Sequence, residues 1–497
     1  MRYNILFGGA AGQGPNILGE ILSKALNKCG YYVFYSRDYQ SLIRGGHNFN
    51  VLTFSEDPIY SNDSKMDVVI ALDENTEKIH KKDLKKNGIL MNAKKENMYF
   101  AGAVFKILGI DFKILDDELK ILEKRYEENL KNSKEGYNEE KRKLCKLEKK
   151  KLKGTFYNGS LGISEGAVKS GLDIYYAYPM TPATPVLTEL AGNQVKNNYL
   201  VLELENEIAV ILAAIGSSIT GAKTMVGTSG GGFDLMSESL SMAGIAEIPL
   251  VLYLAQRPGP ASGVPTYTSQ GDLNLARHAG HGEFSRIVLA PGDPKECEEL
   301  TSQAFYFSQN FKLPAILLSD KHLAESFYTI YKIPKLTKSK KMINLKKFNS
   351  YEWNAEGTST EDAKEINLGV KRRLKIIEDV KKESEKFEMI KSYGKKGSKN
   401  LVILWGSTKG AVLDAVKELD CEVLQILYME PFPIDAVKKL ISKKNIILVE
   451  NNSTAQLGQL IAEKTGIIIE DKNKILRYDG RPFLADELNI EIKKRLK

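Results

Sequence analysis

The fold of this chain is decided by the stretch YPMTPAT at 178–184, together with ENEIA at 205–209 and QRPGP at 256–260. Each stretch follows an apolar run of strand length and stands where that run gives way to a turn or a helix. Each also contains a polar anchor residue, and these are Thr181, Glu207 and Arg257. Open α/β sheets bind ligands just outside the carboxyl ends of their strands. We therefore expect a hydroxyl, a carboxylate and a guanidinium to converge on one ligand site.

The segment around these stretches alternates between strand and helix patterns. Short apolar runs predict strands at 174–177, 223–226, 249–254, 286–289 and 314–318. Apolar residues recur at helical spacing in 162–170 and 208–217, and SGGG at 229–232 predicts a glycine turn. Such alternation is typical of parallel α/β domains.

The length of 497 residues is too great for one hydrophobic core and suggests about three domains. We expect parallel-sheet α/β units at 1–152, 153–335 and 400–497, with a linker at 336–399. The first unit is expected to end with a charge-dense helix within 117–151. Lysine, glutamate, asparagine and serine dominate the linker, in which we expect a helix around 378–393.

The composition is that of an ordinary globular protein, with 42% hydrophobic residues. The longest apolar runs, such as 248–255, are far shorter than the roughly 20 residues that span a bilayer. No long apolar core follows a basic stretch at the N-terminus, so we expect no signal peptide and no membrane partner. The four cysteines are scattered without CxxC spacing, which favours a reduced, cytoplasmic setting. They also provide no clustered thiolates for an iron–sulfur cluster, and we expect no metal ligands in this chain.

The formal net charge of +8 raises the alternative of a nucleic-acid partner. Much of the basic excess lies in two connecting segments, 141–151 and 335–347, which lack the interleaved aromatic residues of a base-stacking surface. Solvated linkers explain such charge runs, so we expect no nucleic-acid partner. Electrostatic attraction to an acidic electron carrier remains an alternative.

A glycine loop, GGAAGQG at 8–14, stands between an expected strand and an expected helix. Backbone amides at a helix N-terminus suit a phosphate or another anion. The candidate residues for such contacts are Gly9, Gly12 and Gly14. The motif RGGH at 44–47 adds a guanidinium and an imidazole, from Arg44 and His47. A tight structural turn and a surface loop are the alternatives for these two elements.

Taken together, the three stretches resemble the α subunit of the 2-oxoacid:ferredoxin oxidoreductases. These thiamine-diphosphate enzymes oxidatively decarboxylate 2-oxoacids onto coenzyme A. The resemblance implies a pyrimidine-binding domain over 153–335, in which Thr181 and Arg257 bind the 2-oxoacid. It also implies that a catalytic Glu207 lies against the aminopyrimidine ring of the cofactor. Two further residues implied to bind the cofactor are Tyr178 and Pro179.

Each of these residues has an ordinary alternative role. Thr181 lies between prolines and could simply belong to a proline-rich turn. A glutamate that opens a helix commonly only complements the helix dipole. Glu205 competes with Glu207 for the catalytic position, although the register of the following helix favours Glu207. An arginine after a strand, such as Arg257, is often a surface or ion-pair residue.

The N-terminal glycine loop and the RGGH motif are together similar to the γ domain of the same family, over roughly residues 1–115. This similarity implies a γ–α fusion in which the loop contacts coenzyme A. The C-terminal unit resembles the family's small, transketolase-C-like domain II, through YMEPFP at 428–433 and VENN at 449–452.

A thiamine enzyme also needs a GDG segment, with an asparagine further on, to hold magnesium and the diphosphate. The full sequence contains no GDG, because both Gly-Asp pairs, at 271–272 and 292–293, are followed by other residues. By resemblance, a separate β subunit supplies the diphosphate grip, the magnesium and an iron–sulfur cluster, and ferredoxin takes the electrons. The asparagine pairs at 197–198 and 451–452 therefore lack the partner that would make them ligands.

We accordingly expect the fused γ–α subunit of a heterodimeric oxidoreductase that acts on 2-oxoglutarate or a broad range of 2-oxoacids. Pyruvate, branched-chain 2-oxoacids and indolepyruvate are alternative substrates. A non-catalytic assembly subunit that binds coenzyme A or a nucleotide is the alternative from another class. The intact Thr181, Glu207 and Arg257 argue against it.

Overall fold

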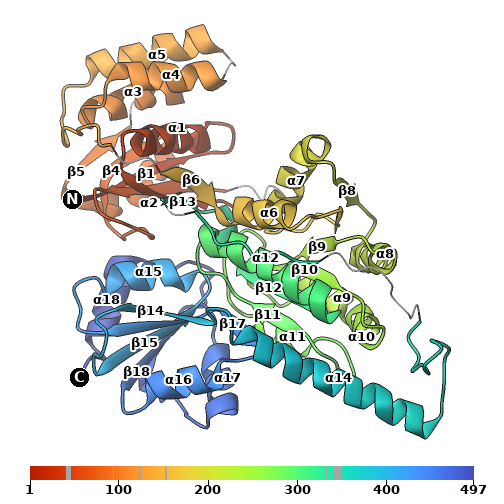
Figure 1. Cartoon of the computed structure of the whole chain (residues 1–497). Helices are drawn as coiled ribbons and strands as arrows, with labels where there is room; N and C mark the ends of the chain where they lie inside the picture. The colour runs from red at the N-terminus through yellow and green to blue at the C-terminus, as the bar shows by residue number, and fades with distance from the viewer. Residues whose placement is uncertain (41–45, 93, 123–124, 152–153, 332, 341–348) are drawn as a thin grey trace. The chain divides into compact units, whose positions relative to one another are not determined.

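The computed structural model describes residues 1–40, 46–92, 94–122, 125–151, 154–331, 333–340 and 349–497. The chain divides into two compact units. Unit 1 consists of Met1–Tyr157, Ser326–Lys332 and Leu484–Leu488. Unit 2 consists of Asn158–Glu325, Ile333–Phe483 and Asn489–Lys497. Sheets and helices build both units, so the expected α/β class is confirmed (Figure 1).

Unit 1 is organised around a 7-stranded sheet in the order β5-β4-β1-β3-β2-β13-β6. Its strands are β1 (Arg2–Gly9), β2 (Tyr32–Asp38), β3 (Asn48–Ser55), β4 (Met66–Ala71), β5 (Leu84–Met91), β6 (Thr155–Asn158) and β13 (Phe327–Ile330). The sheet is mixed, because β1 runs parallel to β4 but antiparallel to β3. Strand β1 ends at Gly9, where the glycine loop begins.

Helices pack on this sheet through one apolar core. They are α1 (Pro15–Lys28), α2 (Glu74–His80), α3 (Asn97–Ile107), α4 (Phe112–Leu122) and α5 (Tyr126–Glu139), with the 3-10 turn η1 (Lys81–Asp83). Helix α1 buries Leu18, Ile21 and Leu22, as its helical spacing predicts. Helices α3 and α5 approach so closely that a Cβ on Gly102 would collide with the backbone of Ser133.

The helical structure expected within 117–151 is confirmed by α4 and α5 as far as Glu139 and is wrong for residues 140–151. Helices α4 and α5 are separate, and the described residues 140–151 form no helix. This segment buries Cys145 and Leu147, and the amide of Leu147 donates to the carbonyl oxygen of Leu108 at 2.9 Å. Charge density suggested a helix, but these two apolar side chains hold the segment against the core instead.

The central sheet of unit 2 has the strand order β17-β11-β12-β10-β9-β7-β8. Its strands are β7 (Ile174–Ala177), β8 (Leu200–Glu203), β9 (Thr224–Thr228), β10 (Leu250–Gln256), β11 (Ile287–Leu289), β12 (Pro314–Asp320) and β17 (Tyr428–Glu430). Strands β7 to β12 are all parallel to their neighbours, whereas β17 is antiparallel to β11. The strands predicted for this segment are therefore confirmed. Their carboxyl ends lie at one edge of the sheet.

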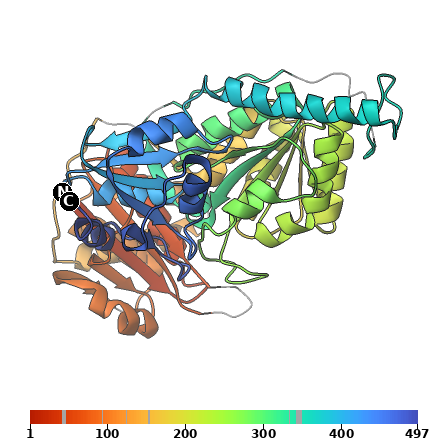
Figure 2. The same cartoon turned by 90° about the horizontal axis from the view of Figure 1, so that it is seen from below.

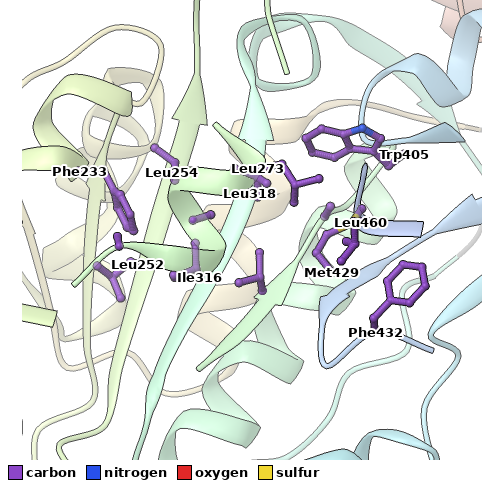
Figure 3. Packing of buried hydrophobic residues seen from close by; sticks show 14 of the residues in the cluster. Phe233, Leu252, Leu254, Leu273, Ile316, Leu318, Trp405, Met429, Phe432 and Leu460 are labelled. Atoms are coloured by element: carbon purple, nitrogen blue, oxygen red, sulfur yellow. The ribbon is translucent and has the colours of Figure 1, made fainter. Parts of the chain in front are cut away.

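Helices cover both faces of this sheet. They are α6 (Gly159–Lys169), α7 (Thr184–Asn197), α8 (Glu207–Ile219), α9 (Gly230–Leu235), α10 (Ser237–Ile245), α11 (Leu273–His278), α12 (Pro294–Phe311) and α13 (Lys321–Glu325). Leu252 and Leu254 of β10 join a core with Phe233 of α9, as Figure 3 shows. The intervening Tyr253 lies near Cys297 of α12 on the other face. Because both faces are covered, the strands are apolar along their whole length.

A second sheet of unit 2, with the order β14-β16-β15-β18-β19, contains the C-terminal strands. They are β14 (Ile390–Gly394), β15 (Asn400–Trp405), β16 (Glu422–Ile426), β18 (Asn445–Glu450) and β19 (Lys474–Leu476). The accompanying helices are α15 (Thr408–Ala415), α16 (Ile434–Ile441) and α17 (Gln456–Thr465), with the turn η2 (Asp471–Asn473). The last helix, α18 (Ala485–Lys493), is divided between the two units after Leu488. Figure 3 shows Trp405, Met429 and Phe432 in the same apolar cluster as Leu252 and Ile316. The two sheets of unit 2 therefore share one core.

The segment 336–399 contains a helix and a strand. Helix α14 (Ala363–Ser384) is drawn as a long helix in Figures 1 and 2, and β14 pairs antiparallel with β16. The helix expected around 378–393 is thus wrong in its bounds, because residues 390–394 form β14. The helix begins earlier, where the side chain of Asp362 accepts the amides of the first turn. Few of its side chains, among them Val380, are buried, so its sequence is too polar to reveal it.

Candidate active site

Four loops meet at the carboxyl edge of the central sheet of unit 2. They follow β7, β8, β9 and β10, which are neighbours in that sheet. Thr181 lies in the first loop, Glu207 after the second strand, the glycines 230–232 after the third and Arg257 after the fourth. The structure therefore brings the three polar anchors of the sequence to one edge.

Arg257 is fixed to the loop that carries Thr181. Its Nη1 donates a hydrogen bond of 2.7 Å to the backbone oxygen of Thr181, so the threonine hydroxyl is not used in this contact. Burial lowers the pKa of Arg257, and the nearby carboxylate of Asp272 opposes that shift. Tyr178 and Pro179 are exposed at the rim of the same loop. Among the described residues, the hydrogen bond of the Arg257 side chain uses Nη1, so Nε and Nη2 can still meet a carboxylate.

Glu207 is the first residue of α8 and is only 4% exposed. The helix is capped by Asn206, whose side-chain oxygen accepts the amide of Ala209 at 3.0 Å, so the glutamate is not needed as a cap. Among the residues that the structure describes, none donates a hydrogen bond to the Glu207 carboxylate. The competing Glu205 is exposed. The buried carboxylate is therefore the one that the helix register favoured.

The glycines after β9 shape the surroundings of Glu207. The predicted turn at 229–232 is instead the start of α9, which begins at Gly230. A Cβ on Gly232 would lie 2.7 Å from Oε1 of Glu207 and would also collide with the hydroxyl of Thr228. Only a residue without a side chain allows the glutamate this position. In the sequence, the glycine triplet that follows β9 and Ser229 could have indicated this space for the Glu207 side chain, called here the cradle of Glu207.

Asp272 is a site residue that the sequence reasoning did not single out. Its amide donates to Oε1 of Gln256 at 2.9 Å, and its Oδ2 is buried without a hydrogen-bond partner among the described residues. Burial raises the pKa of Asp272 to about 6; the charge of Asp234 also raises it, whereas Arg257 lowers it. A Cβ on Gly230 would lie 2.6 Å from Oδ2. The first turn of α9 thus has one carboxyl against Gly230 and another against Gly232.

The loop that carries Asp272 is held by the C-terminal sheet. The amide of Gln270 donates to the carbonyl of Asn451 at 2.8 Å, and the amide of Asn451 donates back to Oε1 of Gln270 at 2.9 Å. Gln270 Nε2 also donates to the carbonyl of Trp405 at 2.8 Å. Asn451 and Asn452, which lack the GDG partner of a magnesium site, therefore position this loop. The Nδ2 of Asn452 donates to the Gln270 carbonyl at 3.0 Å.

In unit 1 the glycine loop is partly closed on itself. The side chain of Gln13 accepts the amide of Ala10 at 2.8 Å, and the amide of Gln13 donates to the carbonyl of Ala10 at 3.1 Å. Gly12 and Gly14 have φ angles of +92° and +81°, which glycine adopts without strain. The loop therefore has the conformation of a tight turn. Its backbone amides after Ala10 lie near the start of α1.

His47 lies in a chain of hydrogen bonds with two residues that the sequence did not suggest. The Nε2 atoms of His47 and His80 are 2.9 Å apart, and Nδ1 of His80 lies 2.8 Å from Oδ2 of Asp83. When His80 donates to Asp83, its Nε2 accepts from His47, and Nδ1 of His47 is left as an acceptor. That atom is buried without a partner among the described residues, and burial, then His80, lowers the pKa of His47.

Asp73 connects the glycine loop with His47. Burial would raise the pKa of Asp73, but hydrogen bonds from Thr76, the charge of His47 and the backbone of Ala10 lower it overall. The loop and His47 therefore share one region of unit 1. Arg44, the remaining residue of the predicted set, lies outside the described residues.

The comparisons with known proteins cover both regions. A family model described as pyruvate flavodoxin/ferredoxin oxidoreductase, thiamine-diphosphate-binding, matches residues 165–391, and one described as pyruvate ferredoxin/flavodoxin oxidoreductase matches 4–96. The alpha subunit of a 2-oxoacid:ferredoxin oxidoreductase from a Sulfolobus species is 30% identical over 617 aligned residues, which cover 100% of this chain and 97% of the relative. The chain belongs to this family of oxidoreductase alpha subunits.

Further relatives agree with that membership. The 2-oxoglutarate synthase subunit KorA of Archaeoglobus fulgidus is 30% identical over 351 residues, or 67% of this alpha subunit and 96% of the relative. The solved 2-oxoglutarate:ferredoxin oxidoreductase of Magnetococcus marinus, with 2-oxoglutarate, coenzyme A and succinyl-CoA bound, has the same fold. It superposes with a TM-score of 0.88 at 23% identity and covers 100% of both chains. The thiamine-diphosphate-binding match spans Thr181, Glu207 and Arg257.

The described part of this alpha subunit contains no group of three or more histidine, cysteine or acidic side chains arranged to hold a metal ion. Its four cysteines are free and buried. Among the same residues, no helix is both long enough and apolar enough to cross a membrane.

Proposed function

We propose that this alpha subunit is a γ–α fusion that oxidatively decarboxylates 2-oxoglutarate, or a broader range of 2-oxoacids, to the acyl-CoA. The observation that carries the proposal is the buried Glu207 carboxylate, which has no hydrogen-bond donor among the described residues. It lies at a strand-to-helix junction inside the segment matched by the thiamine-diphosphate-binding model. The names of the relatives favour 2-oxoglutarate or mixed 2-oxoacids over pyruvate alone.

Glu207 is the acid–base group of this proposal. A carboxyl on a side chain that is only 4% exposed, with no hydrogen-bond donor among the described residues, suits a ring nitrogen of the aminopyrimidine, with which it can share a proton. Gly232 has no Cβ that would displace the Glu207 carboxyl from its position beside α9. Thiamine diphosphate, when bound, supplies the chemistry that breaks the carbon–carbon bond. Tyr178 and Pro179 lie on the exposed rim of the Thr181 loop, where they can contact the cofactor.

Arg257 and Thr181 bind the 2-oxoacid. The bond from Nη1 to the Thr181 backbone leaves the rest of the guanidinium for the substrate carboxylate, a pairing stronger than a neutral hydrogen bond. The threonine hydroxyl is free to donate to the carboxylate or the keto oxygen. It adds no second charge that would have to be desolvated.

In unit 1, the glycine loop and His47 contact coenzyme A. Gly9, Gly12 and Gly14 bring backbone close to a phosphate or to the pantetheine arm, and Nδ1 of His47 offers an acceptor. Arg44 supplies the cation of this site. The imidazole nitrogen Nδ1 of His47, buried without a partner among the described residues, supports the assignment.

A β subunit completes the enzyme. The full sequence has no GDG segment to grip magnesium and the diphosphate. We assign both functions, and an iron–sulfur cluster that passes electrons to ferredoxin, to that partner. The assembly is a cytoplasmic heterodimer.

The test is an assay of the chain co-purified with its β partner, thiamine diphosphate, coenzyme A and a low-potential dye. We expect dye reduction that requires both a 2-oxoacid and coenzyme A, with 2-oxoglutarate among the substrates of highest kcat/KM. Reduction with pyruvate or indolepyruvate alone would contradict the substrate assignment. If coenzyme A binds but no 2-oxoacid reduces the dye, the chain is a binding subunit rather than a catalytic one.

A further inference from the structure

A second carboxyl lies beside the proposed substrate site and has no role in the proposed reaction. Asp272 Oδ2 is buried, accepts no hydrogen bond from the described residues, and lies against the backbone of Gly230 at the start of α9. An acceptor in this position loses the stabilisation of water without gaining that of a donor. The surroundings therefore stabilise the ionised carboxylate less well than water does.

The backbone ties Asp272 to Arg257. Gln256, the residue before Arg257, accepts the amide of Asp272 at 2.9 Å and donates from Nε2 to the carbonyl of Ser319 at 2.9 Å. Gln256 is itself completely buried. The backbone of Asp272 is therefore held beside the residue that precedes Arg257, and the charges of the carboxyl and the guanidinium act on each other.

When a 2-oxoacid is bound, negative charges are in excess around Asp272. The charged groups that act on Asp272 are Arg257, which favours its anion, and Asp234 on α9, which disfavours it. Glu207 lies against Gly232, on the same first turn of α9. A bound carboxylate would occupy Arg257 and add a further negative charge. Both effects disfavour ionised Asp272, beyond the burial that already raises its pKa to about 6.

We propose that Asp272 takes up one proton from solvent when the carboxylate of a 2-oxoacid binds at Arg257, and returns it when that carboxylate departs. This inference rests on the proposed function, because it requires Arg257 to be the carboxylate-binding residue. Asp272 is then a positioning residue. In its ionised form it adds a negative charge near the bound carboxylate, and in its neutral form it does not.

The proposal fixes the direction of the pH dependence. Below about pH 6 the carboxyl is already protonated, so binding takes up no proton and affinity is independent of pH. Above that pH, and until the pKa of the liganded form is reached, binding requires a proton. Affinity then falls by up to about tenfold for each pH unit. The same slope appears in kcat/KM for the oxoacid, while a general loss of stability would change kcat and KM at every pH.

The experiment uses the holoenzyme and N-oxalylglycine, an unreactive analogue of 2-oxoglutarate. The heat of binding, measured at pH 7.5 in buffers of different ionisation enthalpy, gives the protons taken up per ligand. The wild type is expected to take up close to one, and Asp272→Asn none, with analogue affinity and kcat/KM almost flat above pH 6. Asp234→Asn, at an exposed position, lowers the pKa of Asp272 and therefore shifts the start of the pH-dependent range to lower pH.

The possible outcomes distinguish a failure of this proposal from a failure of the proposed function. An enzyme that turns over 2-oxoacids but takes up no proton, or whose Asp272→Asn variant takes up as many as the wild type, overturns the role of Asp272 alone. If the analogue does not bind, the slope of kcat/KM against pH in the wild type and in Asp234→Asn decides the question. An enzyme that turns over no 2-oxoacid overturns both.

Discussion

The candidate site of unit 2 and the glycine-loop region of unit 1 differ in the charge and pairing of their polar groups. In unit 2 the polar groups are charged and partly orphaned: Glu207 has no donor among the described residues, and Asp272 Oδ2 is buried without one. In unit 1 the groups are neutral or already paired, as in the bond of Gln13 to Ala10 and the contact of His47 with His80. Buried charge without a partner suits acid–base chemistry. Backbone amides and neutral imidazoles suit the holding of a ligand that does not react there.

This contrast predicts that the largest catalytic loss comes from Glu207. Glu207→Gln keeps the size of the side chain but cannot hold and return a proton, so kcat should fall about 10²–10⁴-fold. Dye-linked turnover at saturating 2-oxoglutarate measures it. Glu205→Gln, at the exposed position two residues earlier, is the matched control and should leave kcat unchanged. Equal losses in the two variants would show that the buried carboxylate has no special role.

Arg257→Lys is expected to have the next largest effect. Lysine keeps the charge but loses both the planar fork and the bond to the Thr181 backbone. The loss of about 1.5–3 kcal/mol of charge-assisted bonding corresponds to a rise of roughly 10–100-fold in KM for the oxoacid. The KM for coenzyme A should not change. A variant that raises both KM values together would place Arg257 outside the substrate site.

A smaller effect is expected from the cradle of Glu207. The Cβ of Gly232→Ala would lie 2.7 Å from Oε1 of Glu207 and must displace it, so kcat should fall by about 10–100-fold, as expected when a catalytic group shifts by about 1 Å. Gly231→Ala is the matched control, because a Cβ there meets nothing within 4 Å. If the two alanine variants have the same kcat, the cradle does not position the carboxylate.

The smallest effect is expected in unit 1. His80→Gln breaks the link between His47 and Asp83, and the loss of one hydrogen bond should raise the KM for coenzyme A about 2–10-fold. The oxoacid KM should stay constant. The exposed His278 of unit 2 provides the control, His278→Gln. A change in oxoacid KM without a change in coenzyme A KM would remove His47 from the coenzyme A site.

The sequence predicted those features that depend on local pattern. The parallel strands around β10 were visible because each is a continuous apolar run, and Glu207 was favoured because the register of α8 turns it inward. Asp272 was not predicted as a site residue because the position of its carboxyl depends on Gly230 and Gln256, which are distant in sequence. His80 was missed for the same reason, since it lies 33 residues from His47. The bounds of helix α14 were predicted wrongly because only a few of its side chains are buried, so no long apolar stripe marks the helix in the sequence.

The central claim is that the Glu207 carboxyl shares a proton with the thiamine ring and so promotes loss of the proton at C2. Deuterium exchange at C2 of bound thiamine diphosphate, stopped with acid and read by proton NMR, measures this step without substrate or electron transfer. We predict exchange at least about 10²-fold slower in Glu207→Gln than in the wild type, with cofactor affinity retained. Equal exchange rates in the two proteins would contradict the account.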